Sequence, residues 1–400
     1  MIEWIETWSR IIYRRLPPWL LRPLRQLATW LRMMGWGRNP ARWAHILASC
    51  APVPDCVRVF YGFDRIPHPG DVAHGGVVKF QRMQTVLPNV PRQFNILYMV
   101  SSARPEDWEQ LVWLAQRRKA RVVWNQDGVG YPAWHGPGWD TYNLPMKHMI
   151  RVADHVFYQS QFCKLSADRF LGERQGPWEI LYNAVDTRVF TPASCDPDPT
   201  RLILLLGGSQ YQYYRLETAI RTLAELARWR SDAYLLVSGR LRWIPDEARA
   251  AHIARKLASD LGLAGRVKFL GPYSQQQAPD VFRRAHVLLH TKYNDPCPGL
   301  VVEAMACGLP VVYSASGGTP ELVGEEAGIG VPAELSWKQD CPPDPAALAV
   351  AVLQVAEHKA EYAQAALQRA VEHFDLQPWL KRHREVFEDL VCQSSNRAKS

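Results

Sequence analysis

The sequence predicts an α/β protein of two Rossmann-like domains that face each other across a cleft, preceded by an amphipathic helical extension. Two series of β-rich runs alternate with helical stretches, which is typical of parallel strands joined by crossover helices. A segment rich in Pro, Asp and small residues, at about 190–200, separates the two series. A chain of 400 residues is also long for a single core, which favours two domains of ordinary size.

The first 45 residues predict a pair of basic amphipathic helices. They contain eight Arg and only two acids, Glu3 and Glu6, and supply most of the net charge of +8. Basic amphipathic helices with Trp anchors are typical of segments that lie in a membrane surface. We therefore expect residues 1–45 to make peripheral contact with the cytoplasmic face of the membrane. The alternative is a helix pair packed on the protein's own surface. No recognition motif accompanies the charge, so we expect no nucleic-acid partner.

The first domain is expected at 46–193 and the second at 194–372. Predicted strands of the first domain lie at 56–63, 94–102, 120–126, 155–160 and 178–183, and its helices include 105–118 and 162–170. Predicted strands of the second domain lie at 201–208, 233–239, 266–271, 286–291 and 310–314, with helices at 215–229, 246–261, 275–284 and 300–307. The chain is again helical over 345–392, and we expect a C-terminal helix and tail, 373–400, to pack back on the first domain.

The cysteines and the hydropathy pattern argue against a metal site and against a membrane-spanning helix. Eight cysteines are scattered without CxxC pairs or His neighbours at zinc spacing, which predicts cytosolic free thiols and no metal site. We expect no bound cofactor. The sequence shows neither the apolar core of a signal peptide nor an apolar stretch of roughly 18 to 20 residues, so no membrane-spanning helix is predicted.

The most informative stretch is DPCPGLVVEAMACGLP, at 295–310. Two carboxylates, Asp295 and Glu303, stand eight positions apart across a loop broken by Pro and Gly, and a short helical run follows. Helix N-termini have free N–H groups that suit phosphate, and ionised carboxylates accept hydrogen bonds from sugar hydroxyls. The pattern therefore indicates a donor-binding corner of an α/β domain. The alternative is a buried strand–loop–helix with an incidental surface acid.

This spacing resembles the E-x(7)-E signature of glycosyltransferase family 4, the retaining, nucleotide-sugar-dependent enzymes of GT-B-type fold. The resemblance covers roughly 56–390, and it is strongest over 267–324, which is similar to the family motif by motif. It implies that Asp295, where the family has Glu, contacts hydroxyls of the donor hexose and that Glu303 holds the ribose. It also implies that the diphosphate or sugar faces the backbone N–H groups of Gly299, Leu300 and Val301.

Further donor-binding residues implied by the resemblance lie in or beside glycine-rich turns at strand ends: Gly207, Gly208, Ser209, Gly271, Tyr273, Gly317 and Gly318. The family places an Arg or Lys pair after the first of these turns, and the matching cation here is Arg215. Arg240 and Arg242 are alternative phosphate partners. Each turn also has a plain alternative as a tight strand–helix connection.

The first domain matches the family in outline. Gly75 and Gly76, in a long loop after the first predicted strand, resemble the glycine pair that borders the family's catalytic centre. Many family members have a His near this point, and this chain has Gln126 or Asp127 instead, of which we favour Asp127. The alternative for Asp127 is a helix-capping role. Ser160 resembles the family's serine at the end of another strand.

The function implied is a retaining transfer of a hexose from a nucleoside diphosphate sugar to a glycan or lipid-linked glycan, without a metal, as in polysaccharide or lipopolysaccharide biosynthesis. Asp295, Arg215 and Asp127 are the candidate catalytic residues. The alternatives are a non-catalytic nucleotide-sugar-binding scaffold and a nucleotide-sugar epimerase or hydrolase of the same fold. The sugar, the base and the acceptor stay open, because backbone contacts would read the base.

Overall fold

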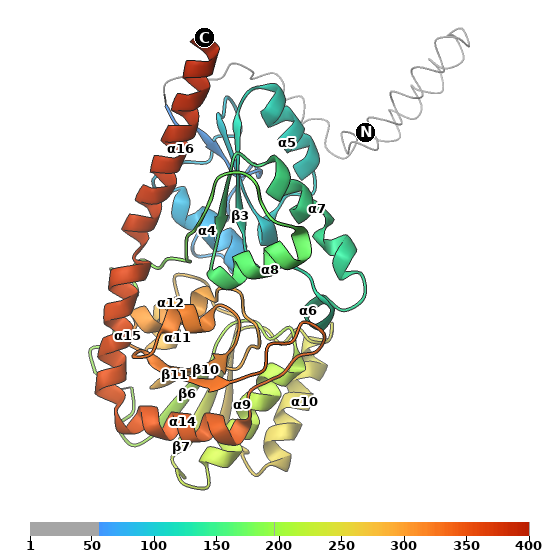
Figure 1. Ribbon diagram of the computed structural model, residues 1–400. Helices are drawn as coiled ribbons and strands as arrows, with labels where there is room; N and C mark the ends of the chain where they lie inside the picture. The colour runs from blue at the N-terminus through green and yellow to red at the C-terminus, as the bar shows by residue number, and fades with distance from the viewer. Residues whose placement is uncertain (1–55, 196, 400) are drawn as a thin grey trace, which may run out of the picture.

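The chain folds into two α/β domains, each built on a parallel sheet (Figure 1). The computed structural model describes residues 56–195 and 197–399. The predicted membrane-contact segment, 1–45, lies outside the described residues. No helix in the described ranges is both long and apolar enough to cross a bilayer. The two alternating series of the sequence thus form the two domains expected from them.

The first domain has a five-stranded sheet of order β1-β2-β3-β4-β5, in which each strand pairs with the next in parallel. Its strands are β1 (Val59–Phe60), β2 (Ile96–Val100), β3 (Arg121–Gln126), β4 (His155–Tyr158) and β5 (Trp178–Ile180). Its helices are α4 (Gly75–Met83), η1 (Ser101–Ala103), α5 (Trp108–Arg117), α6 (Pro132–His135), α7 (Trp139–Val152) and α8 (Gln161–Leu171).

The second domain has a six-stranded sheet of order β11-β10-β9-β6-β7-β8. Its strands are β6 (Leu202–Leu206), β7 (Ala233–Ser238), β8 (Val267–Gly271), β9 (Val287–His290), β10 (Val311–Ala315) and β11 (Gly328–Pro332). Its helices are α9 (Tyr213–Leu226), α10 (Glu247–Asp260), α11 (Ala278–Phe282), α12 (Gly299–Ala306), α13 (Thr319–Val323) and α14 (Pro345–Glu357). After β8 the chain returns to the other side of β6, and such a switch point leaves a crevice at the carboxyl ends of the strands.

Two first-domain predictions differ from the structure. The predicted strand at 56–63 forms only the two-residue β1, and Gly62, with φ +83°, bends the chain soon afterwards. Gly75 and Gly76 do not lie in a long loop, because they begin helix α4. A Cβ at Gly76 would lie 2.6 Å from Ser102 Oγ, so the glycine allows the start of α4 to pack closely against η1.

The C-terminal helices return the chain to the first domain. α15 (Lys359–Phe374) leads to α16 (Leu376–Lys399), which runs along the side of the first domain (Figure 1). Trp379 and Phe387 of α16 are buried in a cluster with Tyr98 of β2, and the Tyr98 hydroxyl lies 3.2 Å from His383 Nε2. The domains are therefore joined at two places, by the segment after β5 and by the step from α15 to α16.

Candidate functional site

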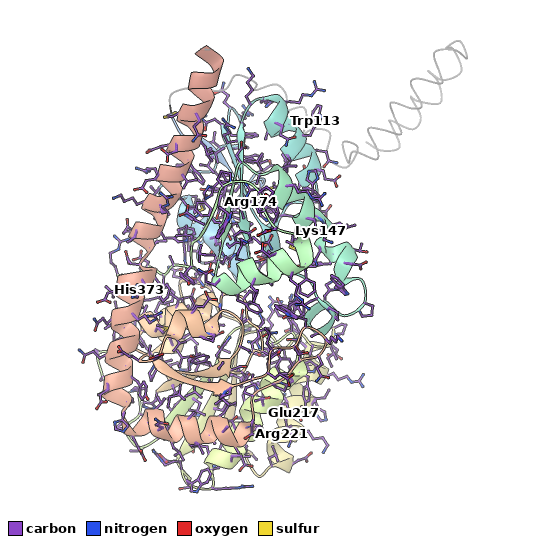
Figure 2. The ribbon with its side chains drawn as sticks, viewed as in Figure 1. Trp113, Lys147, Arg174, Glu217, Arg221 and His373 are labelled. Carbon is purple, nitrogen blue, oxygen red and sulfur yellow. The ribbon has the colours of Figure 1, made fainter. Side chains whose placement is uncertain are left out.

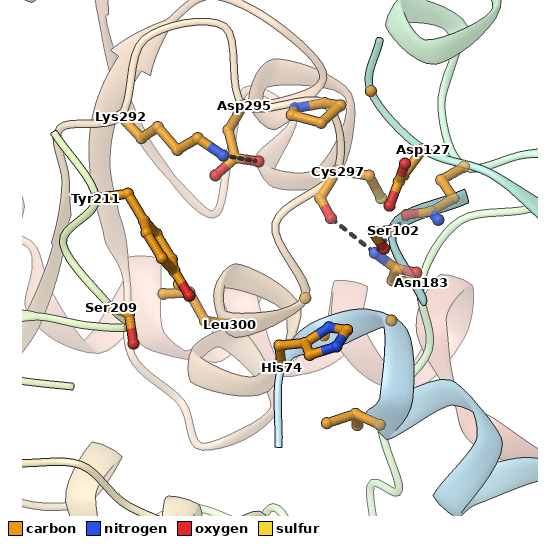
Figure 3. A pocket seen from close by; sticks show the side chains of 18 of the residues that line it. His74, Ser102, Asp127, Asn183, Ser209, Tyr211, Lys292, Asp295, Cys297 and Leu300 are labelled. Carbon is orange, nitrogen blue, oxygen red and sulfur yellow. Dashed lines mark hydrogen bonds and ion pairs between the residues drawn. The ribbon is translucent and has the colours of Figure 1, made fainter. Parts of the chain in front are cut away.

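A cavity of about 460 Å³ lies between the two domains (Figure 3). The first domain contributes α4, the segment after β3, and α6 to its wall. The second domain contributes the loop after β6, the turn after β8, and the segment from Lys292 to Glu303. Carboxyl ends of strands from both sheets meet there, which is where open α/β sheets bind ligands.

The cavity brings together most of the residues singled out in the sequence. Those that line it are Gly75, Gly76, Asp127, Gly208, Ser209, Arg215, Tyr273, Asp295, Gly299, Leu300 and Glu303. Those outside its lining are Gly207, Gly271, Val301, Gly317 and Gly318.

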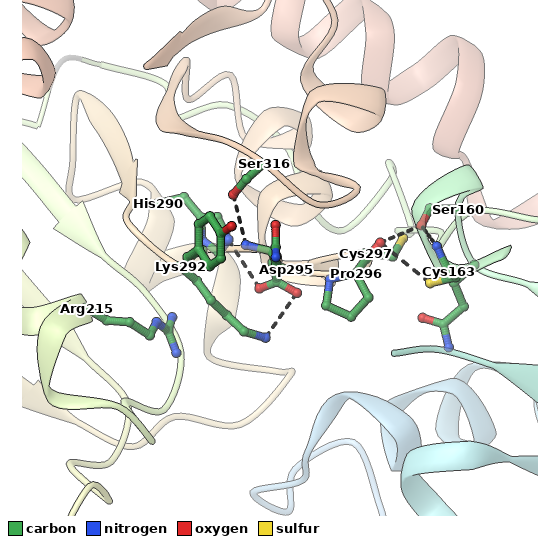
Figure 4. A network of polar contacts seen from close by, with 12 residues as sticks. Ser160, Cys163, Arg215, His290, Lys292, Asp295, Pro296, Cys297 and Ser316 are labelled. Atoms are coloured by element: carbon green, nitrogen blue, oxygen red, sulfur yellow. Dashed lines mark hydrogen bonds and ion pairs between the residues drawn. The ribbon is translucent and has the colours of Figure 1, made fainter. Parts of the chain in front are cut away.

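Asp295 is a buried carboxylate that two basic side chains hold in place. Lys292 Nζ lies 3.2 Å from Oδ1, and His290 Nε2 lies 3.2 Å from Oδ2 (Figure 4). Burial alone would raise the pKa of Asp295, but Lys292 and His290 hold it well below its ordinary value. Asp295 is therefore ionised, and a sugar hydroxyl that binds it has to share the carboxylate with Lys292.

The glycine pair after β10 supports the Asp295 loop from behind. Gly318 N donates to Asp295 O at 2.8 Å. A Cβ at Gly318 would lie 2.1 Å from Pro296 O, and one at Gly317 would lie 2.4 Å from Asp295 O. The backbone of Gly317 and Gly318 thus packs against this loop, outside the lining of the cavity, and their implied donor-binding role stays a prediction.

Helix α12 begins at the cavity, directly after the Asp295 loop. Gly299 and Leu300 form its first turn, where N–H groups have no acceptor within the helix. Val301 does not join them as predicted, because its N–H donates to Pro298 O at 3.0 Å and its side chain is buried away from the cavity. The N-terminus of α12 therefore offers its first two residues to an anion.

Glu303, one turn further along α12, pairs with the first domain. Arg82 Nη2 of α4 donates to Glu303 Oε1 at 2.7 Å and also to Gln275 Oε1 at 3.0 Å. Burial raises the pKa of Glu303, while Arg82 and Gln275 oppose that effect. Arg82 also donates to Ala184 O. Glu303, the acid that the resemblance assigns to the ribose, therefore forms an ion pair with the first domain across the cleft.

The loop after β6 lies against the first turn of α12. Gly207 and Gly208 leave room for the side chain of Leu300. A Cβ at Gly207 would lie 3.2 Å from Leu300 Cδ1, and a Cβ at Gly208 would lie 3.1 Å from Leu300 Cδ2. Arg215 is buried at the cavity, and its Nη1 donates to Ser209 O at 2.9 Å. Burial lowers the pKa of Arg215, and Asp295 acts in the opposite direction.

The alternative phosphate cations after β7 do not face the cavity. Arg240 and Arg242 lie 3.7 and 3.5 Å from Glu247 Oε1 and are absent from the cavity lining. In the turn after β8, Tyr273 lines the cavity, whereas Gly271 pairs with Ser238 of β7 at the end of the strand. Gly271 thus shapes the turn, and Tyr273 presents its side chain to the site.

Asp127 faces the cavity from the end of β3. Ser101 Oγ donates to its carboxylate, and Asp127 N donates back to that hydroxyl at 3.0 Å. The capping alternative is wrong, since the next helix, α6, has Tyr131 as its N-cap residue. Burial lowers the pKa of His74, which precedes α4 and lines the same cavity, and Asp127 opposes this shift.

A second set of contacts joins the domains beside the cavity. Ser160 Oγ donates to Pro296 O at 2.6 Å (Figure 4). The Glu321 carboxylate of α13 accepts hydrogen bonds from the N–H groups of Gln161 and Phe162, at 2.7 and 2.9 Å. The second domain thus caps the N-terminus of first-domain helix α8.

Several cavity residues had no signal in the motifs. Lys79 and Arg82 come from α4, which the sequence did not predict as a helix. Lys292 stands three positions before Asp295, a spacing that could have drawn attention to it. Trp134 of α6 lies with its ring centroid 5.1 Å from Lys292 Nζ. Within the described residues, no group of three or more His, Cys, Asp or Glu side chains is placed to hold a metal ion.

Comparison with known proteins relates the second domain to one family. Residues 193–365 match the family model described as Glycosyl transferases group 1. D-inositol 3-phosphate glycosyltransferase of Mycolicibacterium smegmatis is 31% identical over 157 residues, which are 37% of this chain and 34% of that protein. The matched part thus spans about a third of the length of such curated relatives.

Solved structures match both domains. Anabaena HepE in complex with UDP-glucose has a TM-score of 0.60 and 20% identity, over 74% of this chain and 79% of that chain. Sucrose-phosphate synthase from Thermosynechococcus elongatus has a TM-score of 0.62 and 18% identity, over 78% and 77%. The chain therefore has the two-domain GT-B fold, and its second domain is similar to the glycosyl transferases group 1.

Proposed function

We propose that this protein transfers a hexose from a nucleoside diphosphate sugar to a glycan or lipid-linked glycan acceptor, with retention of anomeric configuration and without a metal. The observation that carries the proposal is the interdomain cavity, which places two buried acids, Asp295 and Glu303, beside the N-terminus of α12. Solved relatives of the fold bind UDP-glucose or UDP, and curated relatives of the second domain are glycosyltransferases.

Charge in the cavity suits the breaking of a sugar–diphosphate bond. That step leaves negative charge on the diphosphate, and an enzyme accelerates it by placing fixed positive potential where the charge develops. Arg215 and the first N–H groups of α12, at Gly299 and Leu300, supply that potential in the second domain. The ionised Asp295 faces the transferred sugar. In a retaining reaction without a protein nucleophile, the donor's own phosphate takes the acceptor proton.

The rim of the cavity supports a carbohydrate acceptor. Trp134 and Tyr142 are 39% and 38% exposed, and both line the cavity on the first-domain side. The apolar C–H faces of a sugar ring stack on aromatic rings, while its hydroxyls reach nearby polar groups. We place the acceptor sugar against Trp134, on the first-domain wall of the cavity.

Membrane contact is the part of the proposal that rests on the sequence of residues 1–45. Their basic amphipathic pattern with Trp anchors fits a protein held on the cytoplasmic face of the membrane. A variant lacking 1–45 should stay in the supernatant when anionic phospholipid vesicles are sedimented, whereas the full chain should pellet. Equal sedimentation of the two forms contradicts the membrane contact.

Transfer is tested with UDP-glucose, UDP-galactose and GDP-mannose as donors and octyl glycosides as acceptors. We expect product with one donor, its loss in Glu303→Ala, and its persistence in the presence of EDTA. Donor binding by the wild type without turnover would favour a non-catalytic scaffold. Conversion of the donor without an acceptor would favour an epimerase or hydrolase, and loss of transfer in EDTA would overturn the metal-free part.

A further inference from the structure

A segment between β11 and α14 of the second domain reaches helix α6 of the first domain (Figure 1). This crossing segment, residues 333–341, contains neither helix nor strand, and Glu334 and Leu335 in it are exposed. Trp337, at its middle, is partly buried, and its carbonyl oxygen accepts a hydrogen bond from Ala133 N of α6 at 3.1 Å. The crossing segment thus joins the two domains beside the cavity.

The Trp337 ring packs into a cluster of aromatic rings from the first domain. It stacks on Phe162, with 5.4 Å between the centroids and 17° between the planes. It also forms edge contacts with Tyr131 and Phe170, with centroids 4.9 and 5.2 Å away. Contacts of this kind contribute free energy beyond the apolar area that they bury. The second domain therefore completes an aromatic cluster that the first domain begins.

Helix α6 depends on this cluster for its position. It has four residues, Pro132–His135, none of which is buried, and it includes Trp134, the ring against which we place the acceptor. The N-cap residue of α6, Tyr131, is buried and contacts the Trp337 ring, while Ala133 donates to the Trp337 backbone. The place of Trp134 in the cavity wall is therefore set in part by Trp337.

The crossing segment also contacts the residue just before Asp295. Asn294 Nδ2 donates to Ser336 O at 3.2 Å. Asn294 is 2% exposed and has φ +48°, a left-handed conformation that is uncommon outside glycine. Because Ser336 and Trp337 are consecutive, one short stretch of backbone contacts both the donor-sugar loop and the helix that carries Trp134.

We propose that Trp337 is a positioning residue, which holds Trp134 at the distance from the Asp295 loop that transfer to the acceptor requires. This inference rests on the proposed function. Trp337 is outside the lining of the cavity, so it acts through α6 and touches no substrate. A displacement of about 1 Å in the acceptor can lower the rate of transfer roughly a hundredfold. The domain that binds the donor thereby determines where the acceptor is placed.

The test compares Trp337→Ala and Trp337→Phe with the wild type, using the donor and the octyl glycoside on which the wild type is active. Trp337→Ala should raise the KM for the acceptor roughly tenfold, whereas the Kd for the donor, measured by titration calorimetry, should stay within about twofold. Trp337→Phe keeps a ring on Phe162 and should stay close to the wild type. Trp113→Ala is the matched control, since Trp113 is partly buried against the first-domain core and outside the cavity lining, and it should change neither constant.

A double-variant cycle with Trp134→Ala separates positioning from general damage to the fold. If Trp337 acts through α6, Trp337→Ala should raise the acceptor KM by less than about twofold once the Trp134 ring is absent. Effects on KM that multiply in the double variant would show that the two residues act independently, and would overturn the inference.

Thermal melting completes the comparison. Trp337→Ala and Trp113→Ala should both melt below the wild type, because each loses buried ring surface. Should Trp337→Ala fail to fold, the acceptor KM should still rise from Trp337→Phe to Trp337→Leu, with the donor Kd unchanged. A donor Kd that rises in step with the acceptor KM, or an equal rise in Trp113→Ala, would make Trp337 purely structural. Transfer by the wild type with an unchanged acceptor KM in Trp337→Ala would refute the positioning role alone, whereas no transfer by the wild type would refute the proposed function and this role with it.

Discussion

Arg82 in the first domain and Glu303 in the second form an ion pair across the cleft, with 2.7 Å between Nη2 and Oε1. The two side chains are only 14% and 6% exposed, so neither charge has much access to water. Removal of one partner from a buried pair leaves the other uncompensated, whereas removal of both is far less harmful.

The first prediction follows from this pair. Arg82→Met should lower the free energy of unfolding by about 3 kcal/mol or more, because Glu303 stays buried without its cation. The double variant with Glu303→Gln should recover part of that loss. Urea denaturation of the four proteins in the cycle measures the coupling. Losses that simply add would show that the pair contributes nothing to stability.

Asp295 cannot be replaced by the longer acid of the family without loss. Its two oxygens already lie 3.2 Å from Lys292 and His290, so one more methylene moves the carboxylate off both partners. Asp295→Glu should therefore lower kcat at least tenfold, with the melting temperature nearly unchanged. Steady-state kinetics with the active donor checks this. A kcat equal to or above the wild-type value would show that the loop adapts freely to either acid.

Trp134, at the rim of the cavity, should contribute to binding of the acceptor and not of the donor. Trp134→Ala should raise the KM for the best octyl glycoside roughly tenfold and leave the KM for the donor unchanged. Trp134→Phe, which keeps a ring, should stay close to the wild type. Trp229→Ala provides the control, since Trp229 is 57% exposed and outside the cavity lining. A raised donor KM in Trp134→Ala would place the donor, not the acceptor, against this ring.

Asp340 should make stability depend on pH. Burial raises its pKa from 3.8 to about 6, so the folded state holds the proton more tightly than the unfolded chain. Stability from this group therefore falls as pH rises between these two values, and the loss is complete above the higher one. Asp340→Asn keeps an acceptor for Gln212 Nε2, which lies 3.1 Å away.

The melting temperature of Asp340→Asn should exceed that of the wild type at pH 8 and equal it at pH 3, measured by differential scanning calorimetry. Asp280→Asn is the control, because Asp280 is 84% exposed. A difference of the same size at both pH values would mean that the substitution acts through packing and not through titration.

The sequence predicted the second domain well, because its strands are continuous apolar runs and its two acids sit at a fixed spacing on one loop and one helix. It missed α4, since the glycine pair that signals a loop begins this helix, where Gly76 is required for close packing. The pairing of Arg82 with Glu303 spans 221 positions, and no local pattern records such a contact. Gly317 and Gly318 follow a strand, as the sequence predicts, but only the fold reveals that they pack against the backbone of the Asp295 loop.

The hydrogen bonds from the N-terminus of α8 to the Glu321 carboxylate would have to break if the two domains moved apart. Movement of the domains apart uncovers the N–H groups of Gln161 and Phe162, and water can take the place of the carboxylate at both. Each exchanged hydrogen bond to this charged carboxylate changes the free energy by about 1.5 to 3 kcal/mol. Any separation of the two domains at this contact is therefore opposed by two charge-assisted hydrogen bonds, and water at both N–H groups offsets part of their loss.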